Sequence, residues 1–558
     1  MERDPALHRS VEKERAGEEK RAKQNPEKPT EGAGRFFHRR NSRLFFQSEY
    51  LSIAPLDSAT PINREHAANA GVRKFAFLFF GTLLFHVAGS WTLPLLDRDE
   101  PRFAEASREM RQRGDYVVPY FNNRYRFDKP PLTYWCQTLS YRAFGENDFA
   151  ARLPSAMAAS LTALLLFAWG RRIGSETIAW SAALMFTLCF QTFIHARAAV
   201  ADMWLVFFMT GAHWAGYELL RDKLKAEGRT TEEEEKIGRR WWWMFYCSLA
   251  LGFLAKGPIG WLPLLTLGVT KFFIPDLKLG RRFLFFTGGL LTLSLVALWG
   301  IPALLRTEGL LLEVGIGKHV IGRSVVVMEG HGPESLWSYA AMLPFYFVLI
   351  FLSFAPWSLK LPWLVRKLWR QRDAFDCYLV AAVSVIFVVF TLVKTKLPHY
   401  TLPAIPLLAL LLAKALADFP AAERFVRRTA IAGGVAALIA LALTPVAARF
   451  SPTLQLLKQA RGDLRPEMEI GVLDYREPSL VWYFRKYIDG WMVNLGAPNL
   501  PAFFAKAGGR IAVMSTEIAD KAYPALPAGW KSYRTRGFNT ASGKWVDLTL
   551  ILKPAEAR

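Results

Sequence analysis

Cysteine is scarce in this chain, and the few cysteines present form no recognisable pattern. Four of the 558 residues are cysteines, none lies in a CxxC pair, and three fall inside apolar runs. We therefore expect buried thiols, and neither a disulfide framework nor a zinc ribbon. The first 40 residues also lack the apolar segment of a secretory signal peptide, so no cleavable leader is expected.

Long apolar runs, in contrast, dominate the middle of the chain. They recur from Phe75 to about Ala448 with short basic interruptions. This distribution excludes a single soluble domain, a coiled coil, a collagen and a fully disordered chain. The net charge of +22 then indicates basic cytoplasmic loops and no nucleic-acid partner. Residues 1–74, rich in both charges, are predicted to be a disordered cytoplasmic tail.

The apolar runs predict a multi-span α-helical membrane protein with about eleven spans, each of about 20 residues. The segments are 75–96, 153–170, 176–194, 199–219, 241–255, 258–274, 283–303, 337–358, 376–394, 397–417 and 429–448. With the N-terminus inside, the cytoplasmic loops hold 22 Lys and Arg, against seven in the short outer loops. Because basic residues accumulate in cytoplasmic loops, we predict a cytoplasmic N-terminus and an extracytoplasmic C-terminus.

Two predicted outer segments are too long to be simple connections. The first, 97–152, contains an amphipathic helix over about 100–112 that could lie at the membrane interface. The second, 450–558, contains three short strand patterns at 468–475, 510–515 and 546–552. We therefore predict a membrane domain over 75–449 and a small C-terminal α/β extracytoplasmic domain over 450–558.

Ionisable residues gather on the outer side of the predicted bundle. Such groups are expensive at a membrane, so each is a functional candidate. The set is Asp99, Asp128, Asp202, Lys256, Lys318, His319, Arg323, His331, Lys394, Lys396, His399 and Tyr400. Span-end lysines can simply anchor helices, and Asp99 and Asp128 can cap a helix or pair with Arg102 and Lys129. Together, however, the residues indicate a cavity that binds an anionic head group.

Several separated strings resemble those of the bacterial GT-C membrane glycosyltransferases. They are DEPRFAEASREM, GDYVVP, FDKPPLTYW, FGENDFAARLPSA, FLAKGP and KTKLPHYTLP, in the family's order over about 90–420. The resemblance is to the branch with the aminoarabinose transferase of lipid A and the dolichyl-phosphate-mannose protein mannosyltransferase-like enzymes. It implies the GT-C fold, a polyprenyl-phosphate-linked sugar donor, reaction at the outer face of the bacterial inner membrane, and inversion at the anomeric carbon.

The resemblance also implies roles for particular residues. Asp99 is the acidic residue near the reacting centre, Arg102 follows it at the family spacing, and Lys129 stands beside Asp128. Asp202 and Lys256 match polar positions that line the cavity.

The resemblance implies further roles at positions where this sequence departs in part from the family pattern. His319 resembles a histidine that, with the carboxylate at 128, can hold a divalent metal such as zinc, although Asp128 is commonly Glu in this branch. Lys396 and Tyr400 fall in the motif that faces the lipid phosphate, and Arg323 aligns only with a one-residue shift.

The chemistry of such a transfer limits what these side chains can do. Lys396, Arg323, Lys256 or a bound metal would stabilise the departing phosphate. A hydroxyl acceptor needs a general base, for which Asp99 is our choice, whereas a phosphate acceptor needs none. The acceptor is left open between a lipid A-type glycolipid, a glycan and a protein. The rival hypotheses are a secondary transporter or lipid-linked-sugar flippase, and a membrane protein whose outer domain binds a partner.

Overall fold

The structure is a computed structural model that describes residues 61–221, 231–275, 277, 279, 282–322 and 335–555. Contacts divide the chain into Met1–Glu65 and His66–Arg558, and the fold below is that of the second unit. Residues 1–60 of the predicted tail lie outside the described residues, and the first described helix begins at Pro61.

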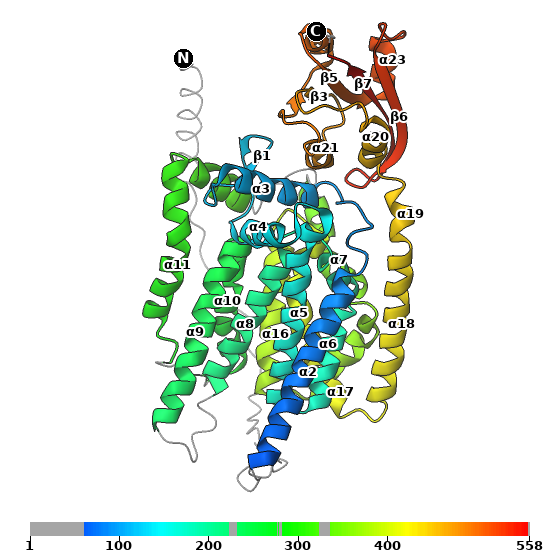
Figure 1. The fold of residues 1–558 in the computed structure, drawn as a ribbon. Helices are drawn as coiled ribbons and strands as arrows, with labels where there is room; N and C mark the ends of the chain where they lie inside the picture. Colours follow the sequence, from blue (N-terminus) through cyan, green and yellow to red (C-terminus); the bar gives the residue numbers. More distant parts are fainter. Residues whose placement is uncertain are drawn as a thin grey trace, which may run out of the picture. The chain divides into compact units, whose positions relative to one another are not determined.

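Helices run back and forth through this unit and form its main bundle (Figure 1). Helical segments occupy all eleven stretches predicted as spans. They are α2 (Pro61–Val87), α5 (Asp148–Ile173), α6 (Glu176–Thr187), α7 (Phe190–His195), α8 (Asp202–Arg221), α9 (Thr231–Lys256), α10 (Leu262–Phe273), α11 (Phe285–Arg306), α13 (Leu336–Met342), α14 (Phe345–Ser353), α16 (Ala374–Leu392), α17 (Ile405–Ala417), α18 (Ala422–Ala442) and α19 (Thr444–Ala448).

Five helical stretches of the described chain are long and apolar enough to cross a membrane. They are Asp148–Ile173, Phe285–Arg306, Ala374–Leu392, Pro398–Ala417 and Ala422–Ala448, with a sixth if a bent helix pair counts as one span. The remaining passes are shorter, broken or interrupted by polar residues such as His213 and Glu218 of α8. The chain is therefore a helical membrane protein, and eleven crossings stay a prediction.

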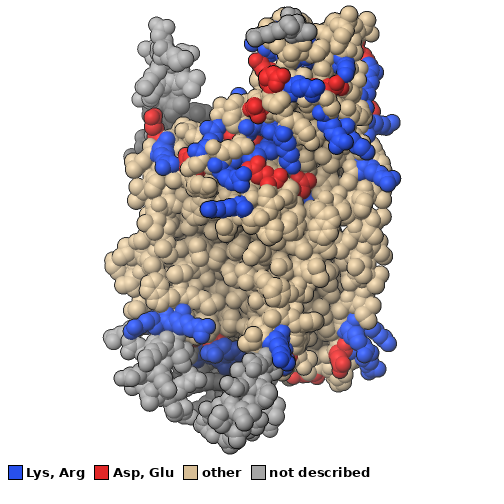
Figure 2. Space-filling view, in the orientation of Figure 1, with Lys and Arg blue, Asp and Glu red and all other residues tan. Residues whose placement is uncertain are grey.

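The charged side chains agree with a membrane position. Figure 2 shows a broad belt without charges on the face in view, bounded below mainly by Lys and Arg and above by charges of both signs. Arg171 and Arg172, at the C-terminal end of α5, are exposed. Such a belt between charged rims is typical of a membrane-embedded bundle.

Local sequence signals explain where the helices begin and how closely they pack. The side chains of Asn147 and Ser175 accept hydrogen bonds from the first turns of α5 and α6, and Asp373 forms a capping box at α16. Gly170 of α5 lets α5 and α6 approach each other closely, because a Cβ at this position would lie 2.7 Å from the Cα of Ala179 in α6. α17 lies at the centre of the bundle, with nearly every side chain buried.

One predicted cytoplasmic loop, Lys360 to Arg372, is instead mostly helical. α15 (Leu361–Arg370) follows a sharp turn of 113° between 337–353 and 357–370. Val365 and Trp369 are exposed beside Arg366 and Arg370. A helix with exposed apolar and basic residues suits the membrane interface, and the prediction missed it because its apolar residues are too few for a span.

The first outer segment forms a layer over one end of the bundle. It contains α3 (Asp99–Arg113), α4 (Leu132–Phe144) and a hairpin of β1 (Tyr120–Phe121) and β2 (Arg124–Tyr125). Asn122 and Asn123 make the turn with positive φ angles, which asparagine tolerates. The predicted helix is confirmed, but most of it is buried, including Glu105 and Arg108, so it is not an interfacial helix with its charges in water.

The C-terminal region contains a five-stranded sheet in the order β4-β3-β5-β7-β6. The strands are β3 (Glu469–Val472), β4 (Val493–Asn494), β5 (Arg510–Ser515), β6 (Lys531–Asn539) and β7 (Lys544–Lys553), and the helices are α20 (Pro452–Ala460), α21 (Pro478–Phe484), α22 (Leu500–Ala505) and α23 (Thr516–Ala522). The three predicted strand segments are confirmed as β3, β5 and β7. β4 and β6 were missed, because β4 has two residues and β6 is rich in polar side chains.

Side chains of α21 join this region to the outer layer. Ser479 donates to both carboxylate oxygens of Asp97, from its amide at 2.8 Å and from its hydroxyl at 2.6 Å. Trp482 and Tyr483 donate to the two carboxylate oxygens of Asp148 at 2.8 and 2.6 Å. These bonds fix the C-terminal region against the segment that leads into α3 and against the first turn of α5.

Candidate active site

A cavity of about 670 Å³ opens where the outer layer meets the ends of several bundle helices. Its wall draws on α3, the loop between β2 and α4, and the ends of α8, α9, α11 and α16. Eight residues that the sequence analysis singled out line it: Asp99, Arg102, Asp128, Lys129, Asp202, Lys256, His399 and Tyr400. The opposite wall is apolar, with Val296 and Leu304 from α11 and Val389 from α16. The cavity thus offers charges on one side and an apolar surface on the other.

A buried ion pair holds α3 in place at the wall of this cavity. Glu100 receives two hydrogen bonds from the guanidinium of Arg152, at 2.7 and 2.8 Å, and another from the amide of Ala199 at 2.8 Å. Asp99 and Arg102 stand three residues apart in the first turn, so they share one face of the helix. Fixing Glu100 therefore fixes the direction from which both side chains enter the cavity.

Arg126 is a cavity residue that the sequence-based prediction missed. It is 8% exposed, its Nε donates to the hydroxyl of Tyr134 at 3.0 Å, and its Nη1 lies 3.0 Å from a carboxylate oxygen of Asp128. Burial alone would lower the pKa of Arg126, but Tyr134 and Asp128 raise it above its usual value. The sequence signal was present, since a cation two residues from an acid in an extended loop lies on the same side.

Asp202 and Lys256 form a buried pair in the same wall. Lys256 Nζ lies 2.5 Å from an oxygen of Asp202, and both side chains are at most 10% exposed. His399 Nε2 stands 3.8 Å from that oxygen, and its ring lies against His195, a residue that was not predicted. Because Lys256 is held by Asp202, it is less available for a phosphate than the prediction assumed.

Lys396, which was predicted to face the lipid phosphate, is buried at the end of α16. It is 5% exposed, and its Nζ donates to the carbonyl oxygens of Phe390, Thr391 and Val393 at 3.1, 2.5 and 2.6 Å. Lysine at the C-terminal end of a helix satisfies carbonyls that have no helical partner. In the structure Lys396 therefore closes α16, and it is not among the residues that line the cavity.

Part of the predicted metal site lies among residues that the structure does not describe. The side chain of His319 and all of Arg323 and His331 lie outside the described residues. Among residues that are described, no group of three His, Cys, Asp or Glu could hold a metal ion. Asp128 already faces the guanidinium of Arg126, which competes with a cation for the carboxylate. A metal held by Asp128 and His319 therefore stays a prediction.

Fold and site together define a class: a helical membrane protein with a charged cavity at one end of its bundle. The family described as "Dolichyl-phosphate-mannose-protein mannosyltransferase" matches residues 128–301. The solved structure of ArnT from Cupriavidus metallidurans bound to undecaprenyl phosphate has a similar fold, with a TM-score of 0.70 at 19% identity, over 88% of this chain and 99% of that one.

Curated relatives show the same similarity in sequence. An undecaprenyl phosphate-alpha-4-amino-4-deoxy-L-arabinose arabinosyl transferase of Aeromonas salmonicida (strain A449) is 29% identical over 66% of this chain and 65% of its own length. An uncharacterized protein of Aquifex aeolicus (strain VF5) is 36% identical over 39% of this chain and 46% of its own length. The chain thus spans about half to two thirds of these relatives. It is similar in sequence to these arabinosyl transferases and similar in fold to ArnT.

Proposed function

We propose that this protein moves a sugar from a polyprenyl-phosphate donor to an envelope acceptor at the outer face of the bacterial inner membrane, with inversion at the anomeric carbon. The acceptor class is a lipid A-type glycolipid, a glycan or a protein. The activity for which the arabinosyl transferase relatives are named and the lipid bound to the ArnT structure support the donor class. The N-terminus lies in the cytoplasm and the C-terminal region outside, as the loop charges indicate.

The observation that carries this proposal is the convergence of distant charged residues on a single cavity. Asp99, Asp128, Asp202 and Tyr400 come from four separate stretches of chain and line the same space. The apolar wall of α11 suits a polyprenyl chain, and this helix is largely exposed toward the surrounding membrane. The polar groups lie at one end of the helices, whereas a transporter tends to bind its substrate near the membrane midplane.

The chemistry follows from the position of the charges. The bond between the anomeric carbon and the phosphate oxygen breaks, its electron pair stays on the phosphate, and an acceptor oxygen bonds to the carbon from the opposite face. Arg102 and Lys129 are the cavity cations that stabilise the departing phosphate, so it needs no proton. With a hydroxyl acceptor, Asp99 takes its proton, a contribution of about 10²–10⁴-fold.

Substitution of Asp99 by Asn tests this mechanism, because the amide keeps the shape and removes the base. With undecaprenyl-phosphate aminoarabinose as donor and a hydroxyl acceptor, we expect transfer to fall about 100-fold or more. Asp547→Asn, at an exposed carboxylate of β7, is the matched control and keeps full activity. Thermal unfolding in detergent checks that both variants fold. Transfer by a folded Asp99→Asn variant at the wild-type rate would remove Asp99 from the mechanism.

A further inference from the structure

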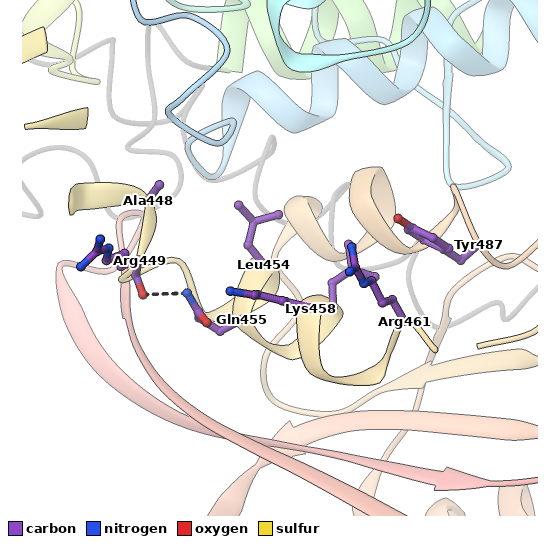
Figure 3. Close-up of a pocket in the computed structure, with 8 residues that line it drawn as sticks. Ala448, Arg449, Leu454, Gln455, Lys458, Arg461 and Tyr487 are labelled. Carbon is purple, nitrogen blue, oxygen red and sulfur yellow. Dashed lines mark hydrogen bonds between the residues drawn. The ribbon is translucent and has the colours of Figure 1, made fainter. Parts of the chain in front are cut away.

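A second hollow, of about 340 Å³, lies in the C-terminal region where the chain leaves α19 and enters α20. It shares no lining residue with the active-site cavity. Its cations are Arg449, directly after α19, and Lys458 and Arg461 at the end of α20, with Leu454 and Tyr487 beside them (Figure 3). Gln455 donates to the carbonyl oxygen of Arg449 at 3.0 Å and ties the two segments together.

We call this hollow, with its cations Arg449, Lys458 and Arg461, the basic groove. Its positive charge is not neutralised by acidic side chains of the described residues. No Asp or Glu lines the groove, and within the described ranges none of its three cations forms an ion pair. Other exposed cations of the region do find acids: Lys531 lies 2.6 Å from Asp463, and Lys521 lies 2.6 Å from Glu517. Three unpaired cations around one hollow favour an anionic ligand.

The position of the groove indicates at which level of the membrane the ligand lies. α18 and α19 form one long apolar stretch, 6% buried, so its side chains face lipid up to Ala448. An exposed aromatic cluster stands beside its end: Phe450, Phe538 and Trp545, with ring centroids 5.6 and 5.8 Å apart. Aromatic side chains gather at the level of lipid head groups. The groove therefore sits next to the head groups of the leaflet on the side of the C-terminal region.

We propose that this groove binds the phosphate head group of an anionic phospholipid, of the phosphatidylglycerol class, from that leaflet. The phosphate lies among Arg449, Lys458 and Arg461, the glycerol rests against Leu454 and Tyr487, and the acyl chains follow α18 and α19. The hollow is about half the volume of the active-site cavity, which suits a small head group better than a phosphorylated disaccharide. This binding is independent of the transfer reaction, because the two sites share no residue.

The test compares lipid binding to the full chain in detergent by native mass spectrometry. The probes are dioleoyl-phosphatidylglycerol and the zwitterionic dioleoyl-phosphatidylcholine. The variant Arg449→Gln/Lys458→Gln/Arg461→Gln should lose about tenfold or more of the affinity for the anionic lipid, since each cation near a lipid surface contributes. The matched control Lys506→Gln/Lys521→Gln/Arg534→Gln removes the same charge outside the groove and should bind as the wild type does.

Three results would overturn the proposal: unchanged binding of the anionic lipid by the groove variant, equal wild-type affinity for the two lipids, or an equal loss in the control. Tighter, variant-sensitive binding of a phosphorylated lipid A-type glycolipid would assign the groove to that other lipid and overturn it as well. If the triple variant does not fold, Lys458→Glu, at an exposed side chain, replaces it with the same expected loss of anionic-lipid binding.

Discussion

At the scale of single residues, Arg126 has the most constrained environment of the cavity cations. Its guanidinium bridges Tyr134 and Asp128 and lies over the ring of Phe103, at 5.2 Å from the centroid. Burial raises the pKa of Tyr134, so its hydroxyl stays protonated and accepts the bond from Nε. The planar guanidinium can hold both partners at once, which a lysine ammonium at the same position does less well. Arg126 is therefore a positioning residue for Asp128.

We predict that Arg126→Gln lowers transfer by about 10- to 100-fold, because a carboxylate shifted by about 1 Å can cost that much. Arg126→Lys should recover part of the loss, since it restores the charge. If Arg126 had only a structural role, both variants would have a lower melting temperature. Their activity per folded molecule would then equal that of the wild type. Steady-state kinetics with a thermal melt of each variant distinguish the two outcomes.

Ionisation of Asp97 makes the contact between the outer layer and α21 depend on pH. Burial raises the pKa of its carboxyl from 3.8 to about 7, and the two hydrogen bonds from Ser479 offset this only in part. In the unfolded chain the carboxyl ionises near pH 4, whereas in the folded protein it stays protonated until about pH 7. Its contribution to stability is full below pH 4 and is lost as the pH rises to 7.

Asp97→Asn should remove this part of the pH dependence. The asparagine can accept from the Ser479 amide and donate to its hydroxyl without ionising. Between pH 4 and 7 the wild type is expected to lose stability relative to the variant by about 1–3 kcal/mol. Thermal unfolding in detergent across this range is the measurement, and parallel curves for the two proteins would contradict the assignment.

At the scale of elements, the turn from α9 to α10 places Lys256 in the cavity. Gly257 adopts a φ of 81°, and η3 (Pro258–Trp261) then folds back onto α9. A Cβ on Gly260 would lie 2.4 Å from the backbone carbon of Gly252, so nothing larger than glycine fits. This close approach keeps the end of α9 beside Asp202.

Gly260→Ala should therefore push η3 away from α9, lower the melting temperature and reduce transfer severalfold. Overpacking of this kind typically costs about 1–3 kcal/mol. Gly268→Ala, inside α10 with open space around its Cβ, is the matched control and should leave both quantities unchanged or slightly raise stability. An equal effect of the two substitutions would show that the backbone contact is not what matters.

At the scale of the whole molecule, the C-terminal region and the outer layer depend on each other. Arg485, just after α21, pairs with the buried Glu105 of α3 at 2.6 Å, and Arg108 of α3 donates to the carbonyl of Trp482 at 3.1 Å. The C-terminal region thus supplies partners for charges buried in the helix that bears Asp99. Removing one partner of a buried pair commonly costs about 3–5 kcal/mol.

Deletion of residues 450–558 should consequently abolish transfer, even though that region lines none of the active-site cavity. We expect a lower melting temperature, since α3 loses the partners of Glu105 and Arg108. A shorter deletion of 554–558 leaves α21 and the sheet complete and should keep full activity. Wild-type transfer by the longer deletion would make the whole region accessory.

The sequence by itself determined the class of fold and most members of the site. Apolar length fixes where helices can enter a membrane, and charged residues are excluded from the lipid, so their positions mark the ends of the bundle. Asp99, Asp128, Asp202, Lys256 and Tyr400 could be selected on this basis. Arg102 and Lys129 were added by the family resemblance, and the structure collects all seven around one cavity.

Only the tertiary structure decided which charges remain available to a substrate. Lys396 matches the expected string, yet its amine is used by the carbonyls at the end of α16. Arg126 lines the cavity and His195 lies against His399, although neither was predicted. The burial of α3 depends on Arg152 and Arg485, which are far away in sequence. The physical reason is that a charge acts through its neighbours within a few ångströms, and in a folded bundle these come from distant parts of the chain.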